Sequence, residues 1–155
     1  MPYLTAVCQE TLRIYPVAML TFPRTPTEPV ALQGYTIEPG TIVMGCIYLL
    51  HQRPALYPSP KHFDPERFLH WQPSPYEFMP FGGGVRRCVG SELALYEMKL
   101  VLFSLLSQYR LALAETRPVK PRRRGLTLGP DGGVKLVMAG THAPARQTAA
   151  ATPSR

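Results

Sequence analysis

The chain has 155 residues and a net charge of +7, with 45% hydrophobic and 17% charged residues. This length suits one domain of the usual size, roughly 100–200 residues, and excludes a large multidomain enzyme. The hydrophobic content excludes wholesale disorder, while 18 prolines and 12 glycines exclude a simple helical bundle because they divide the chain into short elements. The positive charge suits an acidic partner, whether nucleic acid, membrane surface, protein or bound anion.

The first helix is expected over residues 3–15, where apolar side chains fall near one helical face and Pro16 ends the pattern. It starts without a capping residue before it, which suggests missing upstream sequence. Residues 17–22 are apolar and extended, and a turn region follows over residues 25–29.

A β-hairpin is expected next. Residues 31–37 and 42–49 are strand-like, and Pro39-Gly40 between them suits the central positions of a type II turn. Residues 51–80 then hold seven prolines, at positions 54, 58, 60, 65, 73, 75 and 80. Such a density excludes a long helix or a central strand, and long loops inside compact domains are usually functional.

The strongest helical pattern covers residues 91–109, and we expect this helix to be buried. Its apolar stripe consists of Ala94, Met98, Val101, Leu102, Leu105 and Tyr109. A second hairpin is expected from strands 125–128 and 134–137, which flank the glycine-rich turn 129–133. The low-complexity tail, residues 139–155, is expected to be disordered.

The segment FGGGVRRCVG, residues 81–90, has the sharpest local pattern in the chain. A phosphate-binding loop is disfavoured, because it lacks a Lys-Ser/Thr pair and a preceding strand of a βαβ unit. A glycine turn with a buried structural cysteine is the common alternative. That alternative leaves Arg86 and Arg87 unexplained.

The surroundings of Cys88 favour thiolate over thiol: the positive end of the following helix dipole, two guanidinium groups and backbone N–H donors. A thiolate is a soft metal ligand that suits iron in a porphyrin. The glycines would let the backbone approach a flat macrocycle, and an arginine could pair with a propionate. Haem (iron protoporphyrin) is therefore the candidate cofactor.

The same segment resembles the haem-binding loop of the cytochrome P450 family, with the Phe, Gly, Arg, Cys and Gly of that loop at 81, 84, 86, 88 and 90. Glu10-Thr11-Leu12-Arg13 is similar to the family's E-x-x-R helix motif. FDPERF, residues 63–68, is similar to the loop motif whose arginine, here Arg67, joins that pair. Alone, Glu10 and Arg13 would indicate a surface ion pair worth a few tenths of a kcal/mol. Three motifs in family order outweigh that interpretation, and the resemblance covers most of residues 1–138.

The resemblance implies a role for each matching residue of the loop. Cys88 would be the proximal iron ligand and Phe81 would pack near its sulfur. Gly84 and Gly90 would permit the tight loop, and Arg86 would reach a propionate. These residues, with Arg24, form the predicted cofactor site.

Two further groups of residues follow from the resemblance. Glu10, Arg13 and Arg67 would form a buried charge network with a structural and not a catalytic role. Arg24 would be either a second propionate contact or a solvated strand arginine.

The substrate pocket would be lined by Val17, Ala18, Met19, Leu20 and Thr21, and an apolar lining favours an apolar substrate. Residues 126–128 would either line this pocket or belong to a core strand.

Other conspicuous residues receive a structural interpretation. Cys8 and Cys46 lie in apolar contexts that suggest core filling, and three cysteines without CxxC spacing favour a reducing compartment. His51, His62, His70 and His142 lack paired metal-ligand spacing. The basic run 120–124 is expected to be a solvated loop and not a nucleic-acid site.

The implied fold is mainly α with small β-sheets (α+β), the C-terminal part of the cytochrome P450 fold from the K helix through the haem-binding loop and L helix to the final hairpin. Residues 1–138 would be an incomplete domain, because the long central helix with its acid–alcohol pair, the distal lid and most of the substrate pocket find no counterpart. The chain is thus expected to be a fragment.

The implied function is that of a haem-thiolate monooxygenase acting on an apolar molecule. Its electron donor would be a ferredoxin, a flavodoxin or a flavoprotein reductase. The alternatives are a truncated haem-binding remnant without activity and a peroxide-driven or rearranging relative. No apolar run reaches the roughly 18 residues that span a bilayer. We expect a cytoplasmic location if the source is bacterial, and an N-terminal membrane anchor on a longer parent stays open.

Overall fold

The structure is a computed structural model that describes residues 1–142. Its helices are α1 (Pro2–Ile14), α2 (Ile47–His51), α3 (Arg67–His70) and α4 (Ser91–Gln108), with a 3-10 turn η1 (Gly84–Arg86). Its strands are β1 (Val30–Leu32), β2 (Tyr35–Ile37), β3 (Tyr109–Leu113), β4 (Pro121–Arg124), β5 (Thr127–Pro130) and β6 (Leu136–Thr141). The strands form three antiparallel pairs, β1–β2, β3–β6 and β4–β5. The predicted class, mainly α with small sheets, is confirmed.

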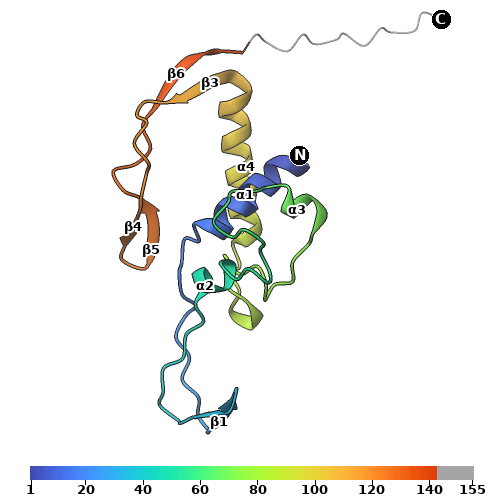
Figure 1. The fold of residues 1–155 in the computed structure, drawn as a ribbon, viewed down its shortest axis with the longest axis vertical. Coiled ribbons are helices and arrows are strands. Elements are labelled where there is room, and N and C mark those ends of the chain that lie inside the picture. Colours follow the sequence, from blue (N-terminus) through green and yellow to red (C-terminus); the bar gives the residue numbers. More distant parts are fainter. Residues whose placement is uncertain (143–155) are drawn as a thin grey trace, which may run out of the picture.

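The helix α1 is the centre of the structure and contacts α2, α3 and α4. Figure 1 shows it crossing α4, with the β1–β2 hairpin at the opposite end of the molecule from β3 and β6. Pro2 stands in its first turn, where no N–H partner is needed, and the helix ends before Pro16 as predicted. The small apolar core around it consists of Ala6, Cys8, Leu12, Ile47 and Tyr57. Burial raises the pKa of the Cys8 thiol, in keeping with the predicted core-filling role.

The first hairpin differs from the prediction. Apart from Val30, the residues of β1 and β2 all lie inside the predicted single strand 31–37, and the two strands are joined by Gln33 and Gly34, whose φ angles are 52° and 83°. The type II turn at Pro39-Gly40 exists, with the Thr41 amide donating to the Glu38 carbonyl at 3.1 Å. It does not join two paired strands, however. The predicted strand 42–49 is wrong, because its residues form two isolated bridges and then α2.

The final hairpin was also predicted with the wrong partners. β4 pairs with β5 around Gly125, whose φ is 63°, so the predicted strand 125–128 includes the turn itself. β6 pairs with β3, which lies immediately after α4. The basic run predicted as a solvated loop is largely the exposed strand β4. β6 continues to Thr141, past the predicted boundary at residue 138, and residues 143–155 of the predicted tail lie outside the described residues.

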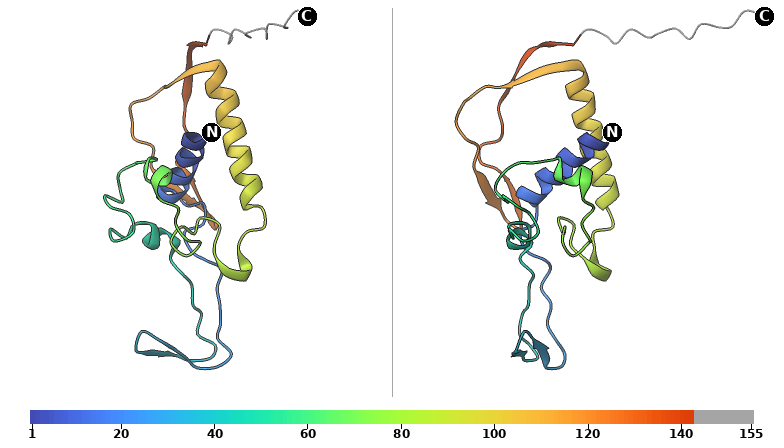
Figure 2. Two further views of the ribbon diagram at one scale, coloured as in Figure 1. Left: turned by 90° about the vertical axis from the view of Figure 1, so that its right-hand side faces the viewer. Right: turned by 45° about the vertical axis from the view of Figure 1, so that its right-hand side comes forward.

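The helix α4 has nearly the predicted bounds, and within residues 1–142 it is largely exposed and not buried. Ser91 is its one buried residue, and Leu93 and Val101 are 61% and 55% exposed. Figure 2 shows the reason: α4 runs past α1, and most of its length has no other element beside it among residues 1–142. A large apolar surface is therefore open on this helix. Within the same residues, no helix has the length and apolarity needed to cross a membrane.

Candidate functional site

The loop before α4 folds back on itself through three backbone hydrogen bonds. The Gly82 amide donates to Met79 O at 3.0 Å, the Arg87 amide to Gly84 O at 3.1 Å, and the Cys88 amide to Phe81 O at 2.9 Å. Gly82 and Gly84 have φ angles of 74° and 64°, which favour glycine. The loop thereby holds Cys88 close to Phe81 at the start of the helix.

Two glycines of this loop differ in what they do. A Cβ at Gly83 would lie 3.1 Å from the Met79 methyl carbon, so the backbone there is closely packed. Gly90 has φ −86°, which any residue adopts. The φ angle of Gly90 therefore does not itself require glycine, and its expected role in the tight loop stays a prediction. A Cβ at this position would instead stand 3.9 Å from the Cys88 sulfur.

Cys88 lines a cavity of about 690 Å³ in front of the loop. This volume falls within the roughly 300–1,000 Å³ of small-molecule sites. The predicted cofactor residues Phe81, Arg86 and Arg24 line the same cavity. Much of the remaining lining is apolar and comes from the segment after α1, with the lining residues Val17, Ala18, Leu20, Thr21 and Phe22.

Cys88 is a free, exposed thiol, and the two arginines before it are separated in space. Arg86 lines the cavity, whereas Arg87 faces Glu92 of α4 with an Nη2–Oε1 distance of 3.6 Å. Arg24 is placed by a backbone bridge, since its amide and carbonyl pair with Val43 at 2.9 and 2.8 Å. The cavity thus has two positive charges and a sulfur in an otherwise mostly apolar wall.

Behind the loop, Glu10 and Arg13 form a fully buried ion pair. Arg13 donates from Nε to Glu10 Oε2 at 2.7 Å and from Nη2 to Oε1 at 2.8 Å, a bidentate contact. Arg13 Nη1 also donates to the carbonyl of His51 at 2.8 Å. The guanidinium of Arg13 also makes a cation–π contact, with its Cζ atom 5.1 Å from the centre of the Tyr57 ring.

Arg67 joins this pair from α3, as the motif predicts. Its Nε lies 3.3 Å from Glu10 Oε1, and the Asp64 amide donates to the same oxygen at 2.9 Å. Arg67 Nη2 reaches the carbonyl of Pro58 at 3.4 Å. Glu10 therefore ties α1 to the proline-rich segment at two points, and the three motif residues meet although Glu10 and Arg67 are 57 positions apart in sequence.

Comparison with known proteins fits this arrangement. The family model described as "Cytochrome P450" matches residues 1–136. The chain belongs to the cytochrome P450 family. "Putative cytochrome P450 135B1" of Mycobacterium tuberculosis is 39% identical over 134 residues, covering 86% of this chain and 28% of the relative. "Cytochrome P450 9e2" of Blattella germanica is 39% identical over 147 residues, covering 88% of this chain and 27% of the relative.

A solved cytochrome P450 has the same fold over this region. The structure described as "Retinoic acid bound cyanobacterial CYP120A1" superposes with a TM-score of 0.80 and 35% identity, covering 89% of this chain and 33% of that one. The chain thus spans between a quarter and a third of the length of the cytochromes P450 it matches. It corresponds to part of the fold only.

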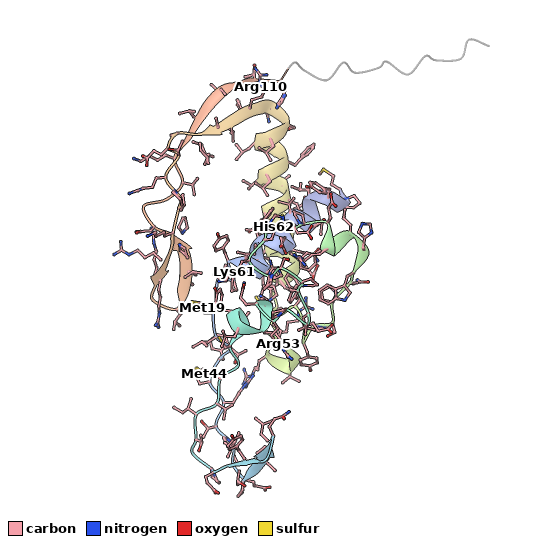
Figure 3. The ribbon with its side chains drawn as sticks, viewed as in Figure 1. Met19, Met44, Arg53, Lys61, His62 and Arg110 are labelled. Carbon is pink, nitrogen blue, oxygen red and sulfur yellow. The ribbon has the colours of Figure 1, made fainter. Side chains whose placement is uncertain are left out.

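Of the five predicted pocket residues, Met19 is absent from the lining of the Cys88 cavity. It lines a neighbouring cavity of about 490 Å³, together with Met44, Leu126 and Thr127. Figure 3 shows Met19 between α2 and the β4–β5 hairpin, with Met44 further toward β1. The two cavities share Ala18, Leu20, Thr21 and Phe22, so residues 126 and 127 do lie beside the apolar segment. Leu128 instead donates its amide to Val17 O at 2.8 Å.

His51 of this cytochrome P450 chain has a structural role that its sequence context did not indicate. Its side chain is fully buried behind the loop and forms hydrogen bonds through both ring nitrogens. Burial is the main cause that lowers the pKa of His51 to about 4. Its place at the start of the proline-rich segment is the one signal in the sequence, and that signal does not reveal its hydrogen-bond partners. Among the described residues, no cluster of three metal-ligating side chains is present.

Proposed function

We propose that the protein carrying these residues is a haem-thiolate monooxygenase, with Cys88 as the proximal ligand of the iron. The observation that supports this most is the shared cavity, in which one free thiol, two arginines and an apolar wall meet. When bound there, haem would supply the O₂ chemistry that inserts one oxygen atom into a C–H bond while the other leaves as water, with electrons from an external donor.

The chemistry of the donor set fits haem. A thiolate sulfur is a soft ligand suited to iron. Arg24 and Arg86 provide two cations for the two propionates, and a guanidinium matches a carboxylate in a bidentate way. Gly82 and Gly83, which line the cavity, keep the backbone there free of side-chain bulk. Phe81, which lines the cavity and whose carbonyl accepts from the Cys88 amide, would shield the sulfur from water.

The Glu10–Arg13–Arg67 network would hold the proline-rich segment in place and take no part in the chemistry. Its charges are buried behind the loop, and they are compensated by each other and by backbone groups. Removing one partner from such a buried network leaves an uncompensated charge, at a cost of about 3–5 kcal/mol. The network would thus keep the ligand loop in one geometry before haem binds.

The substrate would be an apolar small molecule. Val17, Ala18, Leu20 and Thr21 provide the apolar wall of the cavity, with Met19 next to it. A ferredoxin, a flavodoxin or a flavoprotein reductase would deliver the electrons, and the net charge of +7 suits an acidic donor. Residues 1–138 would act as the C-terminal portion of a larger domain, in the cytoplasm if the source is bacterial.

A truncated haem-binding remnant is the second candidate, because the chain spans about a quarter of its relatives and exposes the apolar face of α4. Turnover separates the two. The complete gene product, loaded with haem and given a competent reductase, should hydroxylate members of a panel of fatty acids and terpenes. Haem binding without turnover of any substrate of the panel would favour the remnant.

The ligand assignment is tested by Cys88→Ser in the complete gene product, with Cys46→Ser as the matched control. Both cysteines are free, but only Cys88 lines the cavity with the two arginines. We expect Cys88→Ser to abolish the thiolate signature in the spectrum of the reduced carbon monoxide complex and Cys46→Ser to keep it. A signature that survives in Cys88→Ser would overturn the assignment.

A further inference from the structure

His51, the last residue of α2, forms hydrogen bonds to two segments that are far apart in the sequence. Its Nδ1 lies 3.2 Å from the carbonyl oxygen of Arg13, at the end of α1. Its Nε2 lies 2.9 Å from the amide nitrogen of Met79. The ring is stacked on Phe78 with a centroid distance of 5.5 Å and meets the edge of Tyr57 at 6.0 Å. The imidazole is therefore fixed in position and in orientation.

The two partners determine the protonation state of the ring. A carbonyl oxygen only accepts, so Nδ1 must carry the proton, and a backbone amide only donates, so Nε2 must be bare. His51 is thus the neutral tautomer with hydrogen on Nδ1. The lowered pKa agrees with this state, because burial disfavours the imidazolium.

The contact with Met79 connects α1 to the ligand loop by a continuous set of hydrogen bonds. His51 joins Arg13 O to the Met79 amide. Met79 O accepts from the Gly82 amide at 3.0 Å, which begins the turn of the loop. Phe81, two residues after Met79, accepts from the Cys88 amide at 2.9 Å. The position of Met79 therefore influences where the Cys88 sulfur stands relative to the cavity.

We infer that His51 is a positioning residue for Cys88, and that it acts through the Met79 amide by presenting an unprotonated Nε2. This inference rests on the proposed function, because Cys88 matters as an iron ligand. It assigns His51 no contact with haem or substrate. The acceptor at Nε2 sets the position of the ligand loop through the Met79 amide, whereas the donor at Nδ1 anchors the ring to α1.

Two near-isosteric substitutions separate these contributions. His51→Gln places an amide oxygen near the Nε2 position and can still accept from Met79 N, but it gives up the contact with Arg13 O. His51→Asn places an amide N–H near the Nδ1 position and gives up the acceptor for Met79. Each variant keeps one hydrogen bond and loses the other. Asn is one methylene shorter than Gln and leaves the larger gap, so the hydrogen-exchange measurement described below, which needs no substitution, separates the contact with Met79 from a loss of packing.

The experiment uses the complete gene product loaded with haem, and it reads the ratio of thiolate to non-thiolate form in the reduced carbon monoxide spectrum. We expect His51→Asn to lower this ratio about tenfold, since a buried amide loses its acceptor. His51→Gln should stay within about twofold of the unsubstituted protein. His70→Asn, on the exposed end of α3, is the control and should change nothing. Equal losses in the Asn and Gln variants, or no loss in either, would overturn the inference.

Hydrogen exchange tests the same contact without a variant that must fold. The Met79 amide should exchange at least tenfold more slowly than the exposed, unbonded amides of the same segment in the unsubstituted protein. Exchange at the rate of a free loop amide would also refute the role of His51. Failure of the proposed function has a different signature: the unsubstituted protein would then lack the thiolate form altogether, whatever residue stands at position 51.

Discussion

Replacing Glu10 by Gln should strongly destabilise the protein. Glu10 is fully buried and accepts four hydrogen bonds, two from Arg13 and one each from Arg67 and the Asp64 amide. Glutamine keeps one accepting oxygen and turns its NH₂ group toward a guanidinium. Arg13, which is itself fully buried, then keeps its charge without a counter-ion.

The magnitude follows from that uncompensated charge. Breaking a buried ion pair by removing one partner costs about 3–5 kcal/mol, whereas an exposed pair is worth less than about 1 kcal/mol. The carbonyls of His51 and His62 still accept from Arg13, at 2.8 and 3.4 Å. Because these two acceptors remain, we expect the cost to lie at the lower end of that range, a decrease of about 3 kcal/mol in the free energy of unfolding.

The assay is urea denaturation of the complete gene product, followed by tryptophan fluorescence and circular dichroism. Glu66→Gln is the matched control, because this glutamate is exposed in the same motif segment and its substitution should change the free energy by less than about 0.5 kcal/mol. A loss below about 1 kcal/mol for Glu10→Gln, or one equal to that of the control, would refute the reasoning.

Three further predictions address the cavity, the histidine and the open helix. Arg24→Gln should weaken haem retention about tenfold, measured by the rate at which haem transfers to apomyoglobin. The control Arg53→Gln, on the exposed loop, should leave that rate unchanged. Equal transfer rates in the two variants would show that Arg24 does not belong to the cofactor site. Because the pKa of His51 falls from 6.5 to about 4 on folding, the unfolded chain binds more protons between these values. The stabilisation that depends on neutral His51 should therefore be fully present above pH 6.5, and the free energy of unfolding should fall by about 3 kcal/mol as the pH approaches 4. His51→Gln should remove this part of the pH dependence. An unchanged pH profile in that variant would contradict the prediction. The 155-residue chain alone should aggregate or bind a hydrophobic dye, because α4 is open, and a monomer with a sharp thermal transition would contradict that.

Local motifs could be predicted well from the sequence. Pro16 fixes the end of α1, and spacing three apart places Glu10 and Arg13 on one helical face. The arrangement around Cys88 follows from a short glycine-rich stretch whose geometry is set within about ten residues. Such features depend on nearby atoms, so the sequence contains most of the information needed to predict them.

Strand partners were harder, because two turn signals compete in each region. Pro39-Gly40 forms the turn that its residues predict, yet the hairpin closes at Gln33-Gly34 instead. At the other end, β6 pairs with β3, across an intervening hairpin. A period-two pattern identifies a strand but not its partner, and long-range pairing depends on contacts that no short window contains.

The exposure of α4 and the role of His51 depend on tertiary context. The apolar sequence of α4 predicts burial, but residues 1–142 provide α1 as the main element packed on it. His51 acquires both of its partners only when α1, α2 and the segment before the ligand loop come together. An isolated histidine in the sequence gives no sign of such a bridge.

The most direct test of the central claim is X-ray absorption at the iron edge of the haem-loaded complete gene product. We predict one sulfur in the first coordination shell of the iron, and its loss in Cys88→Ser but not in Cys46→Ser. A shell of nitrogen or oxygen alone in the unsubstituted protein, or a sulfur that persists without Cys88, would contradict the account.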